Sequence, residues 1–157
     1  MKEEDQGMSI IVKTIACIVS TLAIVFGLYL ILHGHLTPGG GFAGGAVIAT
    51  VVALFMVSFG KERLRENLSG QLLSALETTG LIIFIGLAFW GLSATFFCNF
   101  LVNSSEIFGM SIPFGVNTGY LGTGGMIPLM NLAVGLEVFG AISLILLLMF
   151  TSGGDSE

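Results

Sequence analysis

The chain has 157 residues, of which 54% are hydrophobic and 10% are charged, and its formal net charge at pH 7 is −5. A soluble domain carries about a quarter charged residues, so this composition excludes a soluble globular domain. The sequence has no stripe of basic residues, which excludes nucleic acid as a partner. The partner that the composition indicates is the lipid bilayer.

Long apolar runs recur along the chain, and each is close to the roughly 20 residues that cross the hydrocarbon core as a helix. They predict an all-α integral membrane protein with a single transmembrane domain over residues 1–157 and four helices at about 9–32, 38–59, 72–100 and 127–150. The third run is longer than one span requires, so we expect that helix to tilt or to begin in the interface. The first run is too long for the apolar core of a signal peptide, so we expect it to be retained.

The basic residues predict the orientation of these helices. The connections at 33–41 and 101–126 contain no Lys or Arg, and all five basic residues flank the opposite ends of the helices: Lys2, Lys13, Lys61, Arg63 and Arg65. By the positive-inside rule, both termini are cytoplasmic and the 33–41 connection faces outward. The sequence therefore predicts a multi-pass protein of the cell membrane.

Three further features lie in or between the helices. Cys17 and Cys98 fall within apolar runs, and we expect them to be buried free thiols that act as small hydrophobes. The charged stretch at 60–67 is typical of a solvated face and also fits a short interfacial helix. The 101–126 connection is rich in apolar residues, so we expect it to pack on the bundle or dip into the interface.

The most distinctive stretch is HGHLTPGGGFAGG at 33–45. Its Thr-Pro pair predicts a helix start, because proline at the first helical position loses no needed hydrogen bond and the threonine hydroxyl can accept one from the first turn. The glycines after it leave backbone N–H groups open to water, a carbonyl or an anion. They also form small-xxx-small pairs, which let another helix come close. The residues expected to start and pack this helix are Thr37, Pro38, Gly39, Gly40, Gly41, Gly44 and Gly45.

Both histidines belong to this stretch. His33 and His35 are two residues apart, so they cannot share one face of a helix, and no carboxylate or cysteine nearby completes a metal site. The sequence therefore predicts neither a metal nor a cofactor. Two interpretations stay open: the histidines cap carbonyls at the end of the first helix, or they handle protons.

Glu137 is the most informative single residue, because a carboxylate within hydrocarbon is costly and usually marks an ion or proton path or is paired. Its helix face also carries Ala133 and Gly140, and such small neighbours indicate contact with protein. Either this carboxyl is protonated, or its partner belongs to another chain. Glu77 lies near the start of the third helix, where the helix dipole can stabilise an acid; a place in the ion path is the alternative. Asn131 is expected to hydrogen-bond between helices.

The motif at 33–45 resembles the B subunit of Mrp-type (Mnh) multisubunit cation/proton antiporters. The stretch at 122–138 is similar to archaeal-type members, which also occur in Mrp-like modules of respiratory complexes, including membrane-bound hydrogenases. The resemblance covers the four-helix layout and most of the chain. It implies a small accessory subunit of a membrane assembly that exchanges Na⁺ for H⁺, whose other membrane subunits include large antiporter-like ones that carry the main ion paths.

These observations support three functional hypotheses. In the first, the chain is a transport subunit and Glu137, Glu77, His33, His35 and Asn131 lie beside a hydrated path. In the second, it is a purely structural scaffold in the Mrp-like module of a membrane-bound hydrogenase or another complex-I-related respiratory complex. In the third, it is an independent homo-oligomeric channel. By itself the chain is not expected to be an enzyme, because it lacks a nucleophile–base pair and a phosphate loop.

Overall fold

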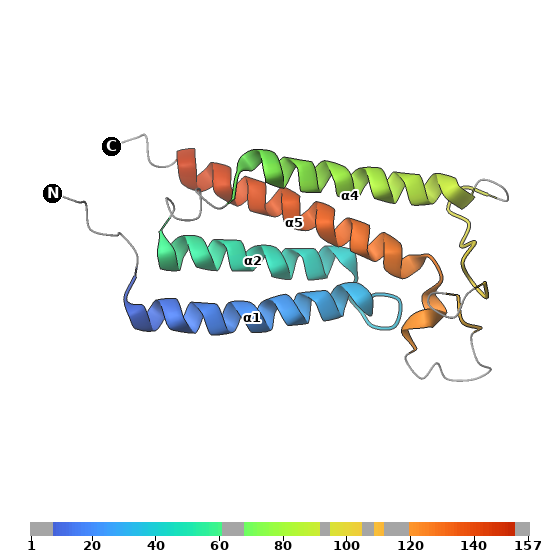
Figure 1. Cartoon of the computed structure of the whole chain (residues 1–157), viewed down its shortest axis with the longest axis horizontal. Coiled ribbons are helices and arrows are strands. Elements are labelled where there is room, and N and C mark those ends of the chain that lie inside the picture. Colours follow the sequence, from blue (N-terminus) through green and yellow to red (C-terminus); the bar gives the residue numbers. More distant parts are fainter. Residues whose placement is uncertain (1–7, 61–67, 92–94, 105–108, 112–119, 153–157) are drawn as a thin grey trace.

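A computed structural model describes residues 8–60, 68–91, 95–104, 109–111 and 120–152 (Figure 1). Within these ranges the chain forms the α-helices α1 (Ile10–Leu32), α2 (Gly41–Phe59), α4 (Gly70–Trp90) and α5 (Ile127–Ser152), and the short 3-10 helix η2 (Leu121–Gly124). All four α-helices are long and apolar enough to cross a membrane. The predicted all-α membrane fold with four spanning helices is confirmed.

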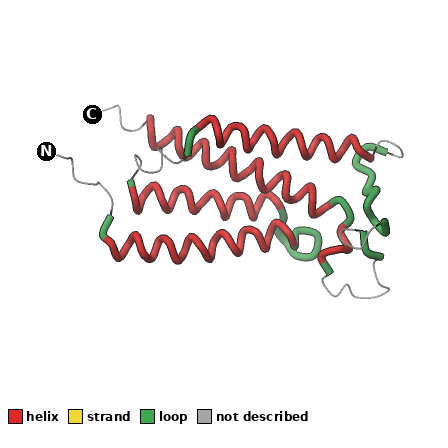
Figure 2. Tube along the Cα trace, viewed as in Figure 1, coloured by secondary structure: helices red, strands yellow, loops and turns green. Residues whose placement is uncertain are grey.

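The helices lie side by side, with α5 between α2 and α4 and with α1 on the other side of α2 (Figure 1). Two helices, α2 and α5, run in one direction, and α1 and α4 run in the other. The described chain begins and ends at the same end of the bundle, and the opposite end carries the connection after α1 and the segments before α5 (Figure 2).

The core is thin, and most apolar side chains of α1 and α4 face outward. One buried cluster joins three helices through Val52, Met56, Leu73 and Leu147. Large outward-facing side chains such as Ile10 (82% exposed) and Trp90 (74% exposed) need an apolar environment. A bilayer supplies it, because every backbone polar group within a helix is already paired.

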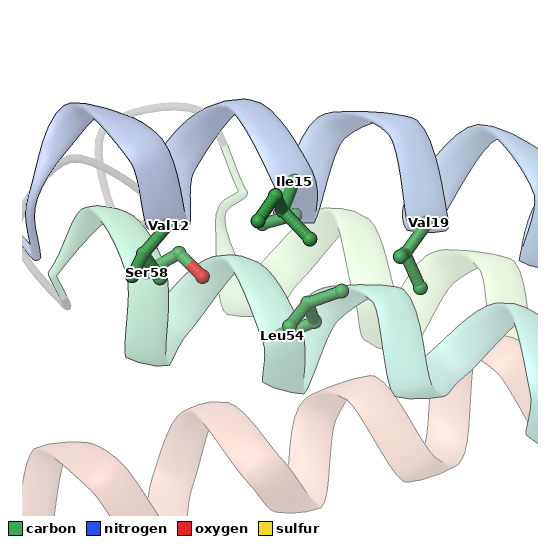
Figure 3. A pocket seen from close by; sticks show the side chains of 6 residues that line it. Val12, Ile15, Val19, Leu54 and Ser58 are labelled. Atoms are coloured by element: carbon green, nitrogen blue, oxygen red, sulfur yellow. The ribbon is translucent and has the colours of Figure 1, made fainter.

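Glycine brings α1 and α2 together near their 33–41 connection. A Cβ atom on Gly44 would lie 2.5 Å from the carbonyl oxygen of Gly27, and one on Gly27 would lie 2.9 Å from that of Gly44. Towards the other end of the bundle the two helices leave a shallow groove of about 170 Å³ (Figure 3). Its lining residues are Val12, Ile15, Ala16, Val19, Leu54 and Ser58.

The start of the second helix differs from the prediction. It begins at Gly41 and not at Pro38, because Gly39 (φ 150°) and Gly40 (φ 106°) adopt backbone conformations that are open to glycine and not helical. The Thr37 hydroxyl does not cap this helix; it donates to the carbonyl oxygen of His33 at 3.1 Å and so closes the end of α1.

The third helix is shorter than predicted. It starts at Gly70, where the Ser69 side chain accepts a hydrogen bond from the backbone N–H of Leu72, and it ends at Trp90 and not near residue 100. The chain turns back after it, since Phe97 has a positive φ of 61° and its N–H donates to the carbonyl of Ala88. The residues that follow Trp90 are also apolar, so the composition did not predict this turn.

The last residues of the 101–126 connection pack on the bundle, while most of its other described residues are exposed or half-buried. Residues 122–126 are buried, and the Met110 N–H donates to the carbonyl of Gly122. Both cysteines are free thiols, but Cys17 is exposed on the outer side of α1, so its predicted burial is wrong. The apolar residues at 107, 108, 112 and 114 and the charged residues 61–67 lie outside the described residues.

Candidate functional site

Glu77 and Glu137 lie at the contact between α4 and α5, two helices that are apolar enough to cross a membrane. A Cβ atom on Gly80 of α4 would lie 2.7 Å from the backbone nitrogen of Glu137 and 2.9 Å from its Cβ. It would also lie 2.6 Å from the carbonyl oxygen of Ala133. Only glycine fits at this position without moving the helices apart.

A reciprocal contact is made by a glycine of α5 against the glutamate of α4. A Cβ atom on Gly140 of α5 would lie 2.7 Å from the backbone nitrogen of Glu77 and 2.8 Å from the carbonyl oxygen of Leu73. Each helix therefore carries the pattern Glu-x-x-Gly, at 77–80 and at 137–140, and each glycine lies against the glutamate of the other helix. We call these four residues the glutamate–glycine crossing.

The crossing places the two glutamates at nearly the same depth. Glutamate and glycine within each pattern are three residues apart, which corresponds to about 4.5 Å of helix rise. Both glutamates are partly buried, and no hydrogen bond or ion pair joins either carboxylate to another described residue. The described ranges contain one basic residue, Lys13, and it lies on α1, which packs on α2.

The position of Glu77 corrects its sequence-based interpretation. The first turn of α4 contains no acidic residue, and Glu77 lies about two turns inside the helix. Stabilisation by the helix dipole, which acts within the first turn, therefore does not account for it. The face of Glu137 that carries Ala133 and Gly140 does meet protein, and this protein is the chain's own α4.

Two partly buried carboxylates on neighbouring helices can exchange protons or hold a hydrated cation through their oxygens. Among the described residues no group of three His, Cys, Asp or Glu side chains gathers as a metal site would require.

The glycines of the 33–45 stretch contact α5 and α1. A Cβ on Gly41 would meet the backbone of Asn131 and Gly135, and one on Gly45 would lie 2.6 Å from the carbonyl oxygen of Gly135. Gly44 contacts α1 instead. The backbone at Gly41, Gly44 and Gly45 is thus covered by the chain itself.

The two histidines have different surroundings. His33 closes α1: its Nδ1 lies 3.1 Å from the carbonyl oxygen of Tyr29, and the two rings stack with centroids 4.1 Å apart. His35 lies against η2, since a Cβ on Gly124 would be 2.9 Å from its Cγ and Cδ2. Asn131 lies beside Gly34 and Gly40, at the start of α5.

Asn99 is a polar residue that reasoning from the sequence missed. Its Nδ2 donates to the carbonyl of Gly124 at 3.1 Å, and its Oδ1 accepts from the N–H of Met126 at 2.7 Å. It therefore holds η2 and caps the start of α5. The reciprocal contacts of Gly80 with Glu137 and of Gly140 with Glu77 were also missed, although the repeated Glu-x-x-Gly pattern is visible in the sequence.

Comparison with known proteins adds relatives that resemble this chain over much of its length. An uncharacterized protein of Methanocaldococcus jannaschii is 36% identical over 134 residues, which cover 85% of this chain and 49% of that protein. The B subunit of the Na⁺/H⁺ antiporter of Bacillus subtilis is 30% identical over 90 residues, or 52% of this chain and 63% of that protein. The chain thus spans about half the length of the first of these relatives.

Among solved structures, the chain is similar to one chain of the membrane-bound sulfane sulfur reductase, an archaeal respiratory membrane complex. The TM-score is 0.73 at 28% sequence identity, and the match covers 95% of this chain and 60% of that chain. Residues 11–144 match the model of the domain related to the MnhB subunit of Na⁺/H⁺ antiporter. Because this match runs from α1 into α5, the chain is a multi-pass membrane protein that belongs to the MnhB-related family.

Proposed function

We propose that the chain is a membrane subunit of a multisubunit cation/proton antiporter, in which it contributes to an ion path used by Na⁺ and H⁺. The family match and the similarity to the B subunit of the Bacillus subtilis antiporter support this proposal. By itself the chain is not an enzyme; it works with other membrane subunits, which include large antiporter-like ones.

The observation that carries the proposal is the glutamate–glycine crossing. It holds Glu77 and Glu137 at the contact of two helices that are apolar enough to cross a membrane, and a carboxylate in such a span is costly unless it serves an ion or is paired. Gly80 and Gly140 bring the backbones of both glutamates into the helix contact. We assign the two glutamates to the path itself, and His33, His35 and Asn131 to the end of the bundle at which the path opens.

The test is Glu137→Gln in the native complex, with Na⁺-dependent proton movement measured in inside-out vesicles. Glutamine keeps the size of the side chain and removes its ionisable group, so we expect transport to fall to the level of vesicles without the complex while the complex still assembles. Glu106→Gln, a change outside the described residues and in the 101–126 connection, serves as the comparison for loss of one charge. Normal transport by an assembled Glu137→Gln complex would remove the crossing from the path.

A second candidate is a scaffold subunit in the Mrp-like module of a respiratory complex. The similarity to a chain of the sulfane sulfur reductase complex favours it. Under this hypothesis the glutamates carry no ions, and the Gln variants leave both transport and redox activity unchanged. Co-purification of the native complex, with its subunits identified, tells whether a redox module is attached.

A further inference from the structure

Three buried polar atoms gather where the 33–41 connection meets the start of α5. Both ring nitrogens of His35 and the side-chain nitrogen of Asn131 are inaccessible from outside and have no hydrogen-bond partner among the described residues. His33, two residues away, does have a partner in the carbonyl of Tyr29. Ser20, Ser58 and Ser143 also have buried hydroxyls without a partner among the described residues, but each offers one such atom, whereas His35 and Asn131 together offer three.

The 33–41 connection and the start of α5 bring the side chains of His35 and Asn131 to the same region. A Cβ on Gly34, the residue before His35, would lie 2.5 Å from Nδ2 of Asn131. A Cβ on Gly124 would lie 2.9 Å from the His35 ring and 2.8 Å from Cδ of Pro128. Pro128 precedes Asn131 by three residues, which is nearly one turn of α5, so the imidazole and the amide flank one turn of the same helix.

Such atoms require partners of a particular kind. Neutral imidazole has one nitrogen that donates and one that accepts, and the amide nitrogen donates. More than about nine in ten buried polar groups in folded proteins have a partner, either protein or ordered water. The partner here must be small, because the atoms are closed off from other subunits, and it must both donate and accept.

We infer that one or two ordered water molecules bridge His35 and Asn131 in a closed polar site beneath η2. Water fits because it needs two to four polar partners, and this junction supplies at least three atoms for it. The carbonyl oxygen of the Asn131 side chain, which lies near Gly40, is a fourth candidate. This site does not depend on the proposed transport function.

The test is a double-mutant cycle on the thermal stability of the purified full-length chain, with His35→Phe, Asn131→Leu and the combination. Each single change strands a polar partner of the water, so we expect each to lower the Tm by about 2–4 °C. The combined change removes both partners, so its effect should be smaller than the sum of the two. His33→Phe combined with Asn131→Leu is the matched control, and its effects should add.

Two results would overturn the inference. If His35→Phe leaves the Tm unchanged or raises it, the imidazole has no partner to lose. If the effects of His35→Phe and Asn131→Leu add, the two residues share no water. Should any variant fail to fold, a map of the native complex at a resolution that shows ordered water decides the question: density within hydrogen-bond distance of both side chains is expected, and a dry junction contradicts the inference.

Discussion

Glu77 and Glu137 hold equivalent places on two antiparallel helices, because each lies three residues before a glycine that contacts the other. The backbone of each glutamate lies in the contact, and each glutamate as a whole is only partly buried. The packing that joins α4 to α5 therefore also sets the depth of both carboxyl groups. Structure and proposed chemistry depend on the same four residues.

This relationship predicts opposite effects for two glycine substitutions on α4. Alanine at an unhindered helical position gains up to about 1 kcal/mol over glycine, and a Cβ on Gly86 would meet nothing within 4 Å. A Cβ on Gly80 would meet backbone atoms of α5, and overpacking of this kind costs about 1–3 kcal/mol. We expect Gly86→Ala to raise the Tm of the purified chain and Gly80→Ala to lower it. Equal effects would contradict the described crossing.

The two glutamates should act as one unit. If both carboxylates serve the same ion, losing either one already disables the site. The complex that carries both Glu77→Gln and Glu137→Gln should therefore show Na⁺-dependent proton movement no lower than that of the more impaired single variant. The measurement is Na⁺-dependent proton movement in vesicles that contain equal amounts of complex. If the double variant instead loses transport by the product of the two single losses, the two carboxylates act at separate sites.

Asn99 should contribute to stability through its two hydrogen bonds. Asn99→Leu leaves the Gly124 carbonyl and the Met126 N–H unpaired, at an expected cost of about 1–3 kcal/mol. Asn99→Asp keeps the acceptor for Met126 and should be milder. The comparison is Asn103→Gly, since Asn103 is exposed and its φ of 59° suits glycine. Thermal unfolding of the three variants measures the order of their stabilities. The prediction is wrong if Asn103→Gly is the most destabilising of them.

The orientation proposed from the basic residues is tested by single cysteines in a chain with Cys17 and Cys98 replaced by alanine. Tyr120 and Met8 are both exposed; Tyr120 precedes η2, and the Met8 N–H donates to the carbonyl of Ser58 near the end of α2, so they belong to opposite ends of the bundle. If the termini are cytoplasmic, an impermeant maleimide added to intact cells labels Tyr120→Cys, and it labels Met8→Cys only after lysis. The reverse pattern would overturn the proposed orientation.

The amino-acid sequence by itself determined the number and type of the helices. Four apolar runs separated by polar or glycine-rich connections leave few alternatives, since a bilayer admits only helices or closed barrels. The sequence also determined the family, through the 33–45 motif and the similarity of residues 11–144. The ends of the helices were harder to predict from the sequence. Trp90 is followed by further apolar residues, and the composition does not reveal the positive φ of Phe97.

Only the tertiary structure decided which residues meet. The depth of Glu137 followed from its position in the last apolar run, but its relation to Glu77 depends on how α4 crosses α5, and that crossing is set by contacts between residues some 60 positions apart. The same holds for His35 and Asn131, which lie in different elements and come together only when η2 folds over the connection. Local sequence encodes a helix because its hydrogen bonds are local; a site between helices depends on close packing of distant segments, and only the folded chain shows it.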